Sequence, residues 1–205
     1  DRPEEARMIL DSIDVSDLSE DEYAYHRLLD IQTSYKLYAP VPSDSTITAC
    51  VDYWRARNNK SRECLALCYR GLTRYSDGKL EEAASDLKAA ESLALGLNDI
   101  YLMNKAFSSL TAVNYASGNN PMTFKYAFKE LETGRQTGND RWTAYAYNHL
   151  ACAYARVKME DSIYFYIRSI IPLLDKLSDR EKAPDLSNIG LYYLNLGDTA
   201  RALEF

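Results

Sequence analysis

The 205-residue chain has few of the residues on which catalysis and metal binding depend. It contains two histidines and four cysteines, and it has no glycine-rich phosphate loop, metal-binding histidine pair or nucleophile elbow. His26 and His149 lie far apart, and neither has a carboxylate or a cysteine at catalytic spacing. We interpret His149, beside Leu150, as a helix-interface residue. The sequence therefore predicts a protein that is not an enzyme, with no catalytic residues, no metal and no cofactor.

The chain also lacks a long apolar run and a basic stripe. Its longest charge-free run, residues 106–124, contains three asparagines and a proline, so no membrane span is expected in this segment. The formal net charge is -6 and the 24 basic residues are scattered. Because phosphate binding needs clustered positive charge, we expect no nucleic acid to bind this segment.

What the chain does have is a repeat. Small residues recur at spacings of 40, 40 and 39, at Gly71, Thr111, Ala151 and Gly190. In residues 79–97 the apolar side chains follow three-four spacing, typical of a helix with one buried face. The acidic and basic residues between them are expected to face solvent, namely Glu81, Glu82, Asp86, Lys88 and Glu91. One hairpin cannot bury such a face alone, so the predicted fold class is all-α, an α-solenoid of antiparallel helical hairpins.

The repeated pattern resembles the tetratricopeptide repeat, which places small residues mid-way along the first helix and an alanine on the second. The residues that carry this resemblance are Gly71, Gly78, Ala83, Leu87 and Ala90, and again Leu150, Ala151, Tyr154, Ile163 and Ile167. The resemblance implies a right-handed superhelix. The period exceeds the family's usual value of about 34 residues, so we expect longer helices or looser turns. The run Asn119-Asn120-Pro121-Met122 predicts a longer turn that places Ala127 and Leu131 about three residues late.

The expected hairpins divide the chain evenly. We place them near residues 20–57, 60–97, 99–137 and 140–177, with an incomplete one at 180–205, all in a single domain of residues 1–205. Ser19 with Glu22 and Ser178 with Glu181 have the spacing of capping boxes. Residues 40–45 predict a rigid turn, and residues 3–13 an isolated second helix. Neither end has the polar cap of a solenoid, so we expect a fragment of a longer protein.

Three of the four cysteines are expected to lie at the same level along two neighbouring antiparallel helices. Cys64 and Cys68 are four apart on one helix, and Cys50 lies on the helix before it. Zinc is disfavoured because no fourth ligand has suitable spacing. We favour reduced packing cysteines, Cys152 included, while a disulfide from Cys50 to Cys64 or to Cys68 is geometrically conceivable.

The resemblance implies that the first helix of each hairpin lines a concave, peptide-binding surface. The expected groove residues are Lys105, Ser108, Tyr115, Tyr145, Asn148, Arg156, Leu191 and Asn195. This mixture of donors and aromatic faces suits an extended peptide or a protein segment. The full lysine and asparagine constellation of the family's carboxylate-clamp members is absent.

A narrower resemblance extends over most of the chain. Residues 3–13, 43–45 and 161–166 resemble the N-terminal repeat region of Bacteroidetes tetratricopeptide lipoproteins or membrane sensors. It implies a periplasmic or membrane-anchored location and the extracytoplasmic sensing part of a regulator. The alternative is a structural scaffold for a cell-envelope complex. Independently, Leu191, Leu194 and Leu196 predict an apolar end face and end-to-end self-association.

Overall fold

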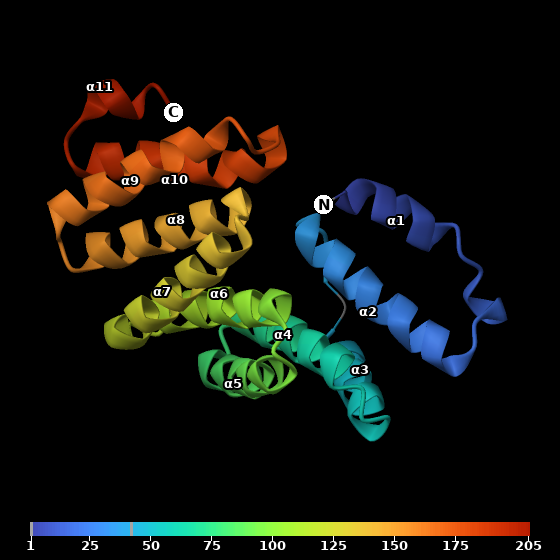
Figure 1. Ribbon diagram of the computed structural model, residues 1–205. Helices are drawn as coiled ribbons and strands as arrows, with labels where there is room; N and C mark the ends of the chain where they lie inside the picture. The colour runs from blue at the N-terminus through green and yellow to red at the C-terminus, as the bar shows by residue number, and fades with distance from the viewer. Residues whose placement is uncertain (1, 42) are drawn as a thin grey trace. The chain divides into compact units, whose positions relative to one another are not determined.

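The computed structural model describes residues 2–41 and 43–205, so Pro42 of the expected rigid turn lies outside the described residues. The described residues form eleven α-helices and one short 3-10 helix, and no strand occurs among them (Figure 1). The predicted all-α fold of sequential helical hairpins is confirmed. No helix in the described part of the chain is both long and apolar enough to span a bilayer.

The chain divides into two compact units after Leu102. The expectation of a single domain stays a prediction, and each unit is described by itself. The first unit contains α1 (Pro3–Asp11), the 3-10 helix η1 (Val15–Asp17), α2 (Glu20–Lys36), α3 (Asp44–Ala56), α4 (Lys60–Ser76) and α5 (Leu80–Leu97). The second contains α7 (Asn120–Thr137), α8 (Asp140–Arg156), α9 (Glu160–Leu174), α10 (Asp179–Asn195) and α11 (Thr199–Ala202). Helix α6 (Ile100–Ala116) begins in the first unit and continues into the second.

A left-handed residue marks each turn in the middle of the chain. These residues have positive φ and recur every 20 positions, at Asn58, Gly78, Asn98, Gly118, Gly138 and Lys158. Glycine and asparagine suit this conformation because it crowds a Cβ atom. Only two or three residues separate successive helices from α3 to α9. The 40-residue period therefore comes from long helices and not from looser turns.

The expectation of a longer turn after Gly118 is wrong. Helix α7 begins at Asn120, which is 40 positions after Leu80, the first residue of α5. The Asn119 side chain accepts a hydrogen bond from the Met122 amide at 3.3 Å, and proline is tolerated in the first helical turn. The second helix is thus in register, and its buried residues include Thr123, Ala127 and Glu130 at the places of Ala83, Leu87 and Ala90.

Two residues of α5 that were expected to face solvent are buried. Asp86 accepts hydrogen bonds from Arg70 at 2.7 and 2.8 Å and from Arg74 at 2.9 Å, both on α4. Glu91 is also buried and pairs with Lys88. The expectation is wrong for both because long cationic side chains cover and neutralise these carboxylates, which lets them leave water.

The capping boxes and the cysteines agree with expectation. Both boxes form, at Ser19 in the first unit and at Ser178 in the second. All four cysteines are free, so neither conceivable disulfide is present. The Cys64 thiol donates to the Ala90 carbonyl at 3.2 Å, and its pKa is raised by a hydrogen bond with Cys68 and by burial. The Cys64 thiol therefore packs in the core and is a poor nucleophile.

Candidate functional site

Helix α8 presents one continuous polar stripe in the second unit. Its members recur at helical spacing and are Arg141, Tyr145, Asn148, Cys152 and Arg156. Helices α8 and α10 contact each other directly (Figure 1). Three predicted groove residues, Tyr145, Asn148 and Arg156, belong to this stripe.

A polar network centred on Asn148 joins α8 to α10. The Asn148 Nδ2 atom donates to Asp185 Oδ1 at 2.7 Å. The Asn148 Oδ1 atom accepts from Asn188 Nδ2 and from the Tyr192 hydroxyl, each at 3.2 Å. Asn148 is only 5% exposed. Its amide is therefore committed to a helix–helix contact. The sequence had instead suggested that Asn148 is open to a peptide.

Asp185 is the member of this network with a buried oxygen that lacks a hydrogen bond in the described part of the chain. It is 1% exposed, and its Oδ2 atom is buried without a hydrogen-bond partner among the described residues. Burial raises the pKa of Asp185, although the Asn148 hydrogen bond and the charges of His149 and Arg141 act in the opposite direction. The carboxylate thus depends on Asn148 for its one direct hydrogen bond.

His149 lies at the contact between α7 and α8, which confirms it as a helix-interface residue. Its Nδ1 atom lies 2.7 Å from Oε2 of the buried Glu130. Burial lowers the pKa of His149, but the negative charge of Glu130 and the hydrogen bond to it outweigh this effect, so the pKa is raised overall. The sequence did not indicate this pair, because the two residues are 19 positions apart on different helices.

The His149–Glu130 pair predicts a pH dependence of stability. Because the folded-state pKa of His149 is raised, its contribution is complete below the unfolded value of about 6.5 and is lost as pH rises through the folded value. We therefore expect the free energy of unfolding to increase as pH falls from about 8 to about 6. Urea denaturation across this range measures the slope. His149→Gln should flatten it, and a variant that keeps the full slope would contradict the assignment.

The remaining predicted groove residues are distributed along the first helices of the second unit. Lys105, Ser108 and Tyr145 are half-buried. Tyr115, Arg156 and Asn195 lie in the last turns of α6, α8 and α10. Arg156 donates to the Tyr115 carbonyl, and its guanidinium carbon lies 3.7 Å from the centroid of the Tyr115 ring.

Leu191 lies one turn before Asn195, and both side chains are exposed. The structure therefore brings Arg156 and Tyr115 together and leaves Leu191 and Asn195 open on α10. The sequence analysis missed the network partners on α10, which are the buried Asp185 and Tyr192 and the half-buried Asn188. A weak signal existed, since Asn148 and Asn188 are 40 positions apart. No group of three histidine, cysteine, aspartate or glutamate residues suited to a metal occurs in residues 2–41 and 43–205.

The fold defines the class of protein as an all-α helical-repeat protein. No family model matches the chain, and no curated protein matches its sequence. The crystal structure of BtubC (BKLC) from P. vanneervenii is similar in fold, with a TM-score of 0.70 over 98% of this chain and 83% of that chain. The two sequences are 15% identical. This likeness supports the repeat fold alone.

Proposed function

We propose that this chain is a tetratricopeptide-type module that binds a protein or peptide without catalysis. The observation that carries the proposal is the set of polar, aromatic and apolar side chains near the C-terminal ends of α6, α8 and α10. They combine an exposed arginine, an exposed amide, a half-buried tyrosine and Leu191, which is 53% exposed. We define the binding surface as Tyr115, Arg156, Leu191 and Asn195.

Each member of this surface supplies a contact that an extended peptide needs. The Tyr115 ring and carbonyl hold the Arg156 side chain in place, which reduces the conformational entropy lost on binding. The other guanidinium donors can bind a carbonyl or carboxylate oxygen of the peptide. Leu191 offers apolar area and Asn195 offers both a donor and an acceptor for a peptide backbone.

We further propose that binding serves sensing by a regulator. This part rests on the resemblance of residues 3–13, 43–45 and 161–166 to Bacteroidetes repeat proteins, which also favours a periplasmic or membrane-anchored location. Binding of a peptide to the repeat module would then be the signal that the regulator senses.

A structural scaffold is the second candidate, favoured by exposed leucines near the last helices. Leu194 lies on α10 and Leu203 follows α11; they are 52% and 84% exposed. Phe205 stacks on Tyr193 with ring centroids 5.9 Å apart and covers part of α10, but these leucines remain open. The predicted end face consisted of Leu191, Leu194 and Leu196; the first two are exposed and Leu196 is half-buried. End-to-end self-association through this face stays a prediction.

The proposed binding surface predicts the effect of a double substitution. Peptides selected against the wild-type chain from a displayed random library should bind Arg156→Ala/Leu191→Ala at least about tenfold more weakly, equivalent to about 1.4 kcal/mol. The loss follows from removing one charged donor and one apolar contact. Fluorescence anisotropy with the selected peptides measures it.

A matched control lies on α9, where Arg168 and Ile171 are also exposed and three residues apart. Arg168→Ala/Ile171→Ala should bind the same peptides with wild-type affinity. Equal affinities for all three proteins would place the binding surface elsewhere. Circular dichroism of each variant establishes that its helices are intact.

A further inference from the structure

Arg62 in the first unit is held between two aromatic rings from different helices. Its guanidinium carbon lies 3.9 Å from the centroid of the Tyr25 ring on α2 and 4.5 Å from that of the Trp54 ring on α3. Arg62 itself is near the start of α4 and is half-buried. Two ring contacts fix the position of a side chain that ordinarily has many rotamers.

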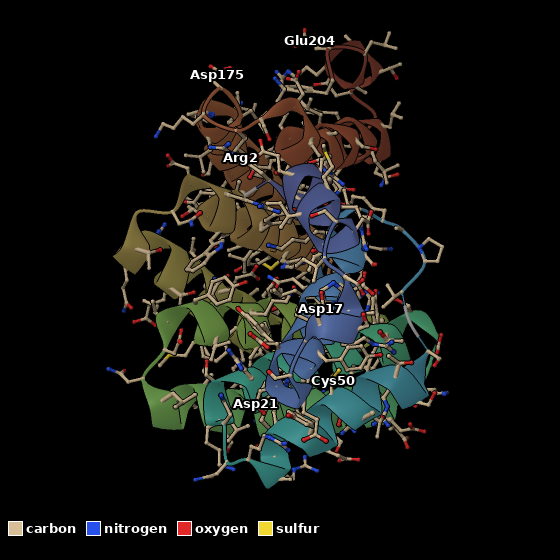
Figure 2. The ribbon with its side chains drawn as sticks, turned by 90° about the vertical axis from the view of Figure 1, so that its right-hand side faces the viewer. Arg2, Asp17, Asp21, Cys50, Asp175 and Glu204 are labelled. Carbon is tan, nitrogen blue, oxygen red and sulfur yellow. The ribbon has the colours of Figure 1, made fainter. Side chains whose placement is uncertain are left out.

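The guanidinium of Arg62 has no hydrogen-bond acceptor or ion-pair partner among the described residues. Asp21 is nevertheless within electrostatic range, because a hydrogen bond from Tyr53 and the charges of Arg57 and Arg62 lower its pKa. The nearby Arg57 is different, because it lies 3.7 Å from the Tyr53 ring centroid and also pairs with Asp21 and Glu20, each at 2.7 Å. Asp21, labelled in Figure 2, also accepts a hydrogen bond from the Tyr53 hydroxyl, so it is already committed.

Trp54 supplies a second donor without an acceptor at the same place. Its Nε1 atom is buried and has no hydrogen-bond partner among the described residues. This atom belongs to the ring on which Arg62 lies. The cluster of Tyr25, Trp54 and Arg62 thus has fixed positive charge and unused guanidinium N–H donors on Arg62, while the Trp54 N–H is buried beside it. A group rich in acceptor oxygens would complement it.

We propose that Arg62 is a receptor for a carboxylate group, supplied by an acidic side chain of a bound peptide. This inference rests on the proposed peptide-binding function and names a contact point within the first unit. The planar guanidinium presents two parallel N–H groups that match the two oxygens of a carboxylate. Tyr25 is 37% exposed, so the cluster is open to solvent on its α2 side.

The charge of the first unit favours a carboxylate over a phosphate. Residues 1–102 contain 19 aspartates and glutamates against 12 lysines and arginines, a formal net charge of -7. A phosphate dianion would be repelled twice as strongly as a carboxylate by this excess of negative charge. One arginine with two aromatic neighbours therefore suits a single negative charge.

Titration of the full chain with N-acetyl-glutamate amide tests the proposal. The indole N–H resonance of Trp54, assigned by its persistence in Trp142→Phe, reports on the cluster in nitrogen-15 spectra. We expect N-acetyl-glutamate amide to shift it saturably and the neutral N-acetyl-glutamine amide to leave it in place. Arg62→Gln should abolish the response. Arg62→Lys should weaken it about tenfold, because the bidentate fork is lost.

Arg57→Gln is the matched control, since Arg57 also lies on an aromatic ring but has carboxylate partners. It should keep the wild-type response. Equal shifts with both amides, no saturable shift, or a response that survives Arg62→Gln would overturn the proposal. So would saturation by inorganic phosphate alone. The Arg156/Leu191 experiment uses other residues and another probe, so either result can fail while the other stands.

Discussion

Gly71→Leu is expected to lower the free energy of unfolding by about 1 to 3 kcal/mol. A Cβ atom on Gly71 would lie 2.7 Å from Leu87 Cγ, 2.9 Å from Leu87 Cδ2 and 3.2 Å from the Ala83 carbonyl oxygen. Leu87 is fully buried and the Ala83 carbonyl belongs to the backbone of α5, so neither can move aside cheaply. Urea denaturation of both proteins measures the difference.

Gly96→Leu is the control for this substitution. Gly96 also lies within a helix, α5, but a Cβ atom there would meet nothing within 4 Å. Because leucine is a better helix former than glycine, this variant should be unchanged or slightly more stable. If Gly71→Leu unfolds at the wild-type midpoint, the close contact between α4 and α5 does not limit stability.

Asn148→Ala is expected to cost about 2 to 4 kcal/mol, the larger of the two effects. The substitution removes the direct hydrogen bond to Asp185, a buried carboxylate, and also leaves the Asn188 amide and the Tyr192 hydroxyl without this acceptor. An unpaired buried charge costs more than the loss of one ordinary hydrogen bond. Urea denaturation measures this loss.

A double-mutant cycle separates the cost of leaving the buried Asp185 carboxylate unpaired from the loss of the other contacts of Asn148. In the Asp185→Asn background, Asn148→Ala should cost less, because no buried carboxylate remains to be left unpaired. Asn195→Ala, which removes an exposed amide from α10, should change stability by less than about 0.5 kcal/mol. A cost for Asn148→Ala that is equal in both backgrounds would mean that Asp185 does not depend on Asn148.

The groove stays a prediction, and Asn148 and Arg156 show why sequence alone defines a groove less well than a fold. Both lie on the predicted stripe of α8, because helical spacing determines which residues share a face. Spacing does not say how close the next helix comes. Asn148 faces Asp185 on α10 at hydrogen-bond distance, whereas Arg156 in the last turn remains exposed. One residue therefore packs and the other is open to a ligand.

The sequence by itself determined the helices, their capping boxes and the small residues at their contacts. These features depend on neighbours within a few positions or on a simple period, as with Ser19 and Glu22 or the recurrence of Gly71 and Gly190. The tertiary structure alone decided which charges are buried and which arginines lack acceptors. Asp86 was expected to face solvent, but α4 places two guanidinium groups against it, and α2 and α3 place the Tyr25 and Trp54 rings against Arg62. The cost of burying a charge depends on the groups that other helices bring to it, and a local pattern does not contain them.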